Sequence, residues 1–188
     1  MLFKRMVGRA FVGLTVLLYL SVACQNCNSS SHELIGQKVV IPTELVNTFN
    51  GKDTLLPDVS QSVATMLIWY DSLGCSSCRI SHMAEWNEWL IYSKALQGNF
   101  QVVFVVTPKA RERKQVRFSL MAYQIDHPVR VDTVGYFLKM NPKLSSNGQI
   151  HVLLLDEQGS VVLAGNPLED VRLMQRYKEE IKRLLIKK

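Results

Sequence analysis

The sequence of 188 residues has few cysteines, no internal repeat and no low-complexity tract. It lacks a G-x-S-x-G motif or an equivalent elbow, so nothing supports a Ser-His-Asp hydrolase. It also lacks the aromatic-basic motifs of proteins that read RNA or DNA. Its formal net charge is +6. Without Lys4, Arg5 and Arg9, 19 basic and 16 acidic side chains remain, and the net charge is +3. This mild excess does not argue for a nucleic-acid partner.

The first 23 residues differ from the rest of the chain. They combine a basic start, the apolar run FVGLTVLLYL and the small residues SVA. The run is short for a membrane span, and the pattern is typical of an export signal. We therefore interpret residues 1–23 as a signal peptide, with a retained transmembrane anchor as the alternative.

The predicted cut site ends in Cys24. Bacterial lipoprotein signals have a leucine, two small residues and then a cysteine whose sulfur takes a diacylglycerol. The stretch LSVAC resembles this pattern, although Leu20 lies one position further out and Ser21 stands at the preferred leucine position. We predict a lipidated Cys24, a polar tether over residues 24–35 with an incidental thiol at Cys27, and a domain over residues 36–188. The domain is expected in the cell envelope, facing the periplasm.

Hydrophobic periodicity predicts alternating strands and helices in this domain. Short strands are expected at residues 36–42, 63–70, 100–108 and 127–132, with a hairpin around Asn50-Gly51 and a second one over residues 150–165. Helices are expected at residues 75–96, 109–124, 134–141 and 168–188. The order predicts an α/β sandwich of three layers, in which helices cover both faces of a mixed sheet.

Cys75 and Cys78, three positions apart, stand where a buried strand turns into a helix. Unpaired N–H groups and the helix dipole at this point favour a thiolate on Cys75. Cys78 is expected one turn further in and more buried, so Cys75 is expected to attack a disulfide and Cys78 to resolve the mixed disulfide. A structural disulfide would close a tiny loop and gain little, and a zinc site would need further ligands. Exchange chemistry is favoured over both.

The strand MLIWYDSLG, the motif CSSC, a long helix, VVFVV and the segment IHVLLLDEQGSVVLAG together resemble the thioredoxin-like superfamily. The resemblance covers residues 36–188 and is greatest to the TlpA/ResA type, the membrane-tethered periplasmic branch, which also has a front hairpin like NGKDTLLPDV. It implies a thioredoxin-like fold with an N-terminal β-hairpin extension. It implies a thiol-disulfide oxidoreductase in which Cys75 attacks and Cys78 resolves, and it implies no cofactor.

The chain departs from this family around the cysteines. Gly74 replaces the usual tryptophan, and two serines replace the usual dipeptide between the cysteines. The buried acid that the family often has six residues before the first cysteine is Trp69 here. Asp71 and Glu85 are the candidate substitutes.

The third departure is His151. The family has a cis-proline just before the first strand of the terminal hairpin, and counting back from Gly159 puts His151 there. A non-proline cis bond costs roughly 3 kcal/mol, so a trans or strained peptide is expected. Copper-binding Sco proteins use two cysteines and a histidine, although their cysteines are spaced differently. A Sco-like copper chaperone using Cys75, Cys78 and His151 is therefore the alternative, unless His151 only replaces the proline.

A domain that only binds a partner remains a third hypothesis, although the intact cysteine pair argues against it. For the favoured hypothesis, the expected partners are exported proteins with disulfides or dithiols and a membrane electron donor. The membrane itself is contacted through the lipid on Cys24.

Overall fold

The computed structural model describes residues 32–54, 62–145 and 151–187. The predicted signal peptide, Cys24 and Cys27 lie outside these ranges. Contacts divide the chain into the units Met1–Glu33 and Leu34–Lys188, and the second unit holds every strand and helix described below. Among the described residues, no helix is long and apolar enough to span a membrane.

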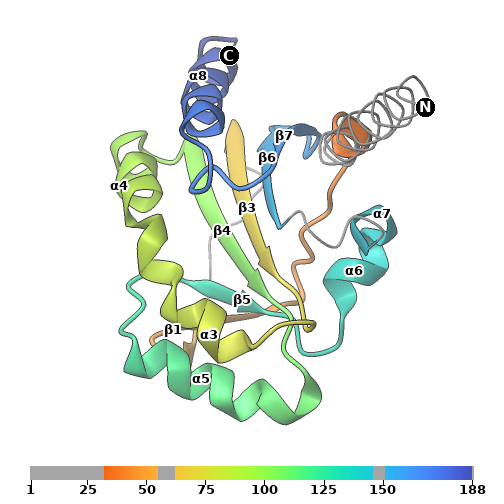
Figure 1. Ribbon diagram of the computed structural model, residues 1–188, viewed down its shortest axis with the longest axis vertical. Helices are drawn as coiled ribbons and strands as arrows, with labels where there is room; N and C mark the ends of the chain where they lie inside the picture. The colour runs from red at the N-terminus through yellow and green to blue at the C-terminus, as the bar shows by residue number, and fades with distance from the viewer. Residues whose placement is uncertain (1–31, 55–61, 146–150, 188) are drawn as a thin grey trace, which may run out of the picture. The chain divides into compact units, whose positions relative to one another are not determined.

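Seven strands form one mixed sheet in the described part of the chain (Figure 1). They are β1 (Val46–Phe49), β2 (Lys52–Asp53), β3 (Ala64–Tyr70), β4 (Phe100–Val106), β5 (Val129–Val131), β6 (Val152–Asp156) and β7 (Val161–Ala164). Their order across the sheet is β2-β1-β5-β4-β3-β6-β7. Strands β3, β4 and β5 run parallel, whereas β1 and β6 pair antiparallel to them. The predicted hairpins at both ends of the strand order are confirmed.

Helices cover both faces of the sheet, as the sequence predicts. They are α3 (Ser76–Ser81), α4 (Asn87–Ala95), α5 (Arg113–Ala122), α6 (Tyr136–Met140), α7 (Pro142–Ser145) and α8 (Val171–Ile186), with 3-10 turns η2 (Met83–Trp86) and η3 (Ala110–Glu112). Alternate residues of β3 point to opposite faces. Met66 and Ile68 pack in a core with α3, α4, α5 and α8, and Leu67 and Trp69 pack in a second core with α6 and α7.

The helix predicted for residues 75–96 is broken at His82 into α3, η2 and α4. Past this break Trp86 is buried, and its indole N–H donates a hydrogen bond to the hydroxyl of Tyr70 at 3.1 Å. Burial raises the pKa of that hydroxyl, so it stays neutral. After the break, α4 buries Trp89, whereas Ile91 on the same helix is 68% exposed.

The strand predicted for residues 36–42 is wrong. Only Lys38 forms a β-bridge there, to Ser160. A side chain replaces the strand partner further on: Asn141 accepts from the Val40 N–H at 2.8 Å and donates to the Val40 carbonyl at 2.7 Å. Residues 36–39 thus form backbone hydrogen bonds with residues 159–161, and the Asn141 amide satisfies the backbone of Val40 where this pairing ends.

Candidate functional site

The cysteine pair lies at the carboxyl end of the parallel strands. Strand β3 ends at Tyr70, and the five residues that follow lead directly into α3 (Figure 1). Cys75 and Cys78 form a disulfide, with their Cα atoms 5.3 Å apart. Ligand sites of open α/β sheets occur at this end, outside the carboxyl ends of the strands.

Cys75 caps α3 with its sulfur. Its backbone is extended, and its Sγ accepts a hydrogen bond from the Cys78 N–H at 3.2 Å. A sulfur that accepts a backbone N–H is stabilised as a thiolate, because the donor dipole points at the charge. The two cysteines are therefore chemically unequal although they share one short helix.

The expected burial of Cys78 is wrong, because both cysteines are exposed. The buried residues of α3 are Ser76 and Ile80, which lie one turn apart on one face. Cys78 is two residues from each and so faces the other side of the helix. Inequality between the cysteines comes from hydrogen bonding to Cys75 rather than from burial of Cys78.

A buried carboxylate, Asp71, connects three elements around the pair. Its Oδ1 accepts from Arg79 Nη1 on α3 and from the Leu73 N–H, both at 3.0 Å. Its Oδ2 lies 3.0 Å from Nε2 of His151, which directly precedes β6. The Asp71 residue is only 4% exposed. Burial alone would raise the pKa of Asp71, but the hydrogen bond with His151 and the charge of Arg79 outweigh burial and lower it.

Gly74 makes room for Arg79. A Cβ at position 74 would lie 2.8 Å from Nε and from Nη2 of Arg79, which is too close for an ordinary contact. The guanidinium also lies 5.9 Å from the ring centre of Tyr70. The glycine before Cys75 therefore lets a cation reach the buried Asp71.

His151 and Trp69 lie side by side at the ends of their strands. The backbone N–H of Trp69 donates to the backbone carbonyl of His151 at 2.8 Å. This bond continues the pairing of β3 with β6 by one residue. Their ring centres are 5.4 Å apart. The bond between Ile150 and His151 involves a residue outside the described ranges, so the expectation of a trans or strained peptide stays a prediction.

The two candidate substitutes for the buried acid differ in environment. Asp71 is buried beside α3, as described above. The side chain of Glu85 is 58% exposed and pairs with His82 at 2.6 Å. Glu85 follows the break after α3 and does not supply a buried carboxylate.

Metal ligands do not gather in the described part of the chain. No group of three or more histidine, cysteine, aspartate or glutamate side chains there could hold a metal ion. The set proposed for copper, Cys75, Cys78 and His151, is not such a group in the disulfide form. His151 instead directs Nε2 to Asp71.

Sequence reasoning missed two residues at this site. Arg79 ion-pairs with Asp71, and Glu112 accepts a hydrogen bond from Ser76 at 2.9 Å. Glu112 belongs to a charged run that looks like a solvated helix face in the sequence. The only available signal for Arg79 was its position one helical turn after Cys75.

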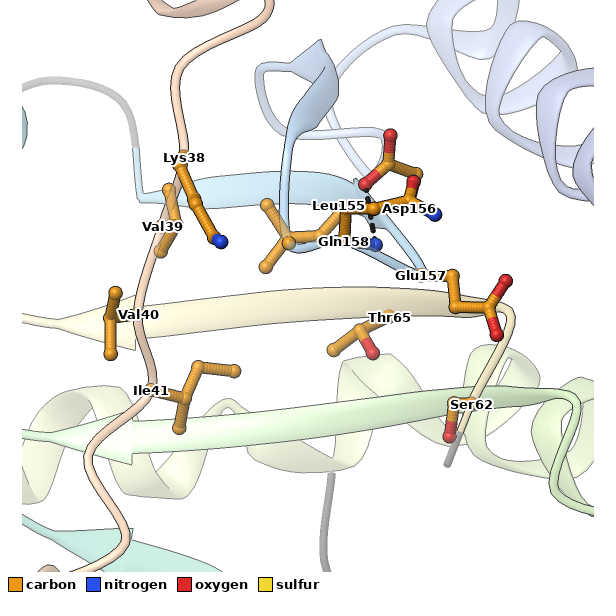
Figure 2. Close-up of a pocket in the computed structure, with 11 residues that line it drawn as sticks. Lys38, Val39, Val40, Ile41, Ser62, Thr65, Leu155, Asp156, Glu157 and Gln158 are labelled. Atoms are coloured by element: carbon orange, nitrogen blue, oxygen red, sulfur yellow. Dashed lines mark hydrogen bonds between the residues drawn. The ribbon is translucent and has the colours of Figure 1, made fainter. Parts of the chain in front are cut away.

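A pocket of about 230 Å³ lies away from this site (Figure 2). It is lined by Lys38, Val39, Val40, Ile41, Ser62, Thr65, Leu155, Asp156, Glu157, Gln158 and Gly159. Thr65 is near the start of β3, at the opposite end of this strand from the loop that leads to Cys75. The polar groups that converge here include Asp156, whose Oδ1 already accepts two N–H groups of its own hairpin turn. The cysteine pair, rather than this pocket, is the candidate site.

Comparison with known proteins supports the fold. No family model matches the sequence, and a search of curated proteins found no significant relative. Among solved structures, a thioredoxin-like protein in the oxidised form is 17% identical, covers 82% of this chain and 97% of its own, and has a TM-score of 0.51. The described sheet, the helices on both faces and this similarity show that the chain has a thioredoxin-like fold.

Two further structures have the same fold and are named for thiol chemistry. A candidate thiol:disulfide interchange protein, DsbE, from Chlorobium tepidum is 22% identical, with 78% of this chain and 97% of that chain covered and a TM-score of 0.53. A candidate protein disulfide isomerase from Bacteroides thetaiotaomicron is 18% identical, with 79% and 90% covered and a TM-score of 0.51.

The Asp71 network generates a stability prediction. Asp71→Asn removes the charge that Arg79 and His151 share, and it should lower the free energy of unfolding by about 2 kcal/mol at neutral pH. The lowered pKa of Asp71 in the folded chain means that its stabilisation is present above the unfolded pKa and lost as the pH falls through the folded one. The difference in the free energy of unfolding between Asp71→Asn and the wild type should therefore become smaller below about pH 4. Urea titrations at several pH values measure it.

The matched control is Asp53→Asn, which breaks the ion pair of Asp53 with Arg117. Both side chains of that pair are exposed, so the loss should stay below about 1 kcal/mol. Equal losses for the two variants, or a difference that persists in acid, would contradict the role assigned to Asp71.

Proposed function

We propose that this protein catalyses thiol–disulfide exchange through Cys75 and Cys78. The observation that carries the proposal is the exposed disulfide at the start of α3, in which Cys75 Sγ accepts the Cys78 N–H. This arrangement offers an accessible sulfur, a stabilised thiolate and a second thiol within bonding distance. Those are the requirements of exchange through a mixed disulfide.

In the proposed reaction, the Cys75 thiolate of the reduced protein attacks one sulfur of a substrate disulfide. The substrate bond breaks, its second sulfur leaves as a thiolate, and a mixed disulfide joins Cys75 to the substrate. Cys78 then loses its proton and attacks Cys75 Sγ, which releases the remaining substrate sulfur as a thiolate. The substrate gains two electrons, the protein becomes a disulfide, and the released thiolates take up two protons. The reverse sequence oxidises a substrate dithiol.

The surroundings of the pair suit protein substrates. Leu73, two residues before Cys75, is 78% exposed. Val134, in the loop that follows β5, and Tyr136, the first residue of α6, are exposed at the same end of the sheet. Exposed apolar side chains beside a reactive disulfide favour contact with a partner polypeptide. Exported proteins with disulfides or dithiols are the proposed substrates, and a membrane protein is the proposed electron donor.

The network around Asp71 supports a charge effect on the pair. Arg79 of α3 and His151 bind the two oxygens of the same Asp71 carboxylate, and Arg79 already balances its charge. A positive charge near a thiol favours the thiolate. We therefore assign His151 a role in setting the reactivity of Cys75, acting through its charge.

The proposed location is the cell envelope. The export signal predicted for residues 1–23 and the lipidation pattern at Cys24 support it, as does the resemblance to the TlpA/ResA branch. Reactive disulfides of exported proteins are also the natural substrates of such a location. The domain is proposed to face the periplasm while a lipid holds its N-terminal end at a membrane.

The direct test is to trap the mixed disulfide. Cys78→Ala leaves an attacking Cys75 that nothing resolves, so mixed disulfides with envelope proteins should accumulate and appear on non-reducing gels. Cys75→Ala should trap little, because the Cys75 sulfur accepts the backbone N–H of Cys78, and no described N–H donates to the Cys78 sulfur. Wild-type protein should accelerate the reduction of insulin by dithiothreitol, and each single variant should lose at least roughly 90% of that acceleration.

Trapping by Cys75→Ala alone would reverse the two roles. If wild-type protein exchanges no disulfide substrate at all, the domain is a binding module rather than an enzyme.

The role of His151 is tested by titrating the Cys75 thiol. His151→Ala should raise the pKa of Cys75 by roughly half a unit, because a cationic ring near the thiolate is lost. The rate of alkylation of the reduced protein as a function of pH gives this value. The control is His82→Ala, which removes an exposed histidine paired with Glu85 and should leave the pKa unchanged. If the pKa of Cys75 is unchanged in His151→Ala, His151 has no role in setting it and only occupies the position of the family's proline.

The location is tested at Cys24. Cys24→Ser should abolish labelling with a radioactive fatty acid in a bacterial host and release the protein from the membrane fraction. Cys27→Ser serves as the control and should leave both unchanged, because Cys27 lies in the predicted tether. Labelling that persists in Cys24→Ser would exclude the lipoprotein assignment.

A further inference from the structure

Ser76, the residue directly after Cys75, is anchored to a distant carboxylate. Ser76 is the first residue of α3 and is 1% exposed. Its hydroxyl donates a hydrogen bond to Glu112 Oε2 at 2.9 Å. Glu112 ends η3, directly before α5, and is 36 residues away in the sequence. The bond therefore fixes a carboxylate at the end of the helix where the Cys75 sulfur also lies.

The charge of this carboxylate is not balanced in the way that the charge of Asp71 is. Asp71 has Arg79 and His151 as ionic partners. Among the described residues, no lysine or arginine forms an ion pair with Glu112. The adjacent Arg113 instead directs its guanidinium to the Thr133 carbonyl. Glu112 thus places a carboxylate against the residue next to the attacking cysteine, in a run that also contains Lys109 and Arg111, for which no ion pair with Glu112 occurs among the described residues.

Two effects of Glu112 act in the same direction. A carboxylate near Cys75 repels a thiolate there. The hydrogen bond also commits the Ser76 proton to Glu112, so that this hydroxyl cannot donate to a neighbouring sulfur. Both effects disfavour the thiolate of the reduced protein and leave the disulfide form untouched.

We propose that Glu112, held by Ser76, sets the redox balance of the Cys75–Cys78 pair toward the disulfide and makes the reduced protein a stronger reductant. The proposal deepens the exchange function proposed above and rests on it. It assigns a direction to the chemistry, namely electron flow from the protein to substrate disulfides. Glu112 acts as a positioning and electrostatic residue and does not touch the substrate.

The relevant equilibrium is that with glutathione. Two glutathione thiols reduce the Cys75–Cys78 disulfide to a dithiol and form one glutathione disulfide. Two electrons pass to the protein, and the two thiol protons go to the cysteines or to solvent. Any group that destabilises the Cys75 thiolate lowers the reduced fraction at a fixed glutathione ratio.

The decisive variant is Glu112→Gln, which removes the charge but keeps an oxygen that can accept from Ser76. Its Cys75 pKa, measured from the pH dependence of alkylation, should fall by roughly half a unit or more. Its equilibrium constant for reduction by glutathione at pH 8 should rise roughly threefold. The control is Glu157→Gln, which removes the same charge from the hairpin turn at the distant pocket and should change neither quantity.

Ser76→Ala provides the second measurement. It frees the Glu112 side chain to move into solvent, so both quantities should shift in the same direction as in Glu112→Gln but by less. Circular dichroism of each variant checks that the fold is kept.

An unchanged Cys75 pKa and glutathione equilibrium in a folded Glu112→Gln variant would overturn the proposal, as would a rise in the Cys75 pKa in either variant. These outcomes differ from failure of the proposed function. If the wild-type protein exchanges insulin disulfides and Glu112→Gln has the same Cys75 pKa and glutathione equilibrium, only the role proposed for Glu112 is wrong. Wild-type protein that exchanges none would remove the exchange function itself.

Discussion

The site depends on one buried carboxylate. Asp71 follows β3 directly, and its two oxygens bind Arg79 on α3, His151 before β6 and the backbone N–H of the loop between β3 and α3. A buried carboxylate without partners would cost several kcal/mol or lose its charge. Its partners therefore hold the helix, the loop and the neighbouring strand in one arrangement. The position of the cysteines relative to His151 follows from that arrangement.

The two charged groups around the pair have opposite consequences. On one side, Asp71 binds both Arg79 and His151, and the proposed role of His151 is to add positive charge there. On the other side, Glu112 accepts a hydrogen bond from the neutral hydroxyl of Ser76, and its proposed role is to add negative charge. The reactivity of a thiol depends on such nearby charges, because they act on the thiolate and not on the neutral form. Residues outside the CSSC motif can therefore change the thiol reactivity of the cysteine pair.

The glycine before Cys75 gives the Arg79 guanidinium the space in which it lies. A larger residue at position 74 would require this guanidinium to shift, and the shift would alter its ion pair with Asp71. Trp69, near the end of β3, packs against His151.

The sequence by itself determined the layers of the fold and the location of the cysteine pair. Strand β3 reads as a continuous apolar run and α8 as an amphipathic helix, because burial on both faces or on one face leaves a local periodic pattern. The hairpin at Asn50-Gly51 has an equally local signal. The strand–helix junction at Cys75 follows from the same patterns.

Only the tertiary structure decided which side chains meet at that junction. Asp71 and His151 are 80 residues apart, and Ser76 and Glu112 are 36 apart. Such pairs leave no periodic signal, because any charged residue of a solvated face could have formed them. The exposure of Cys78 was also missed, because it depends on which face of α3 packs on the core. Local patterns determined the elements, whereas the packing of distant elements at one end of the sheet determined the charges around the cysteines.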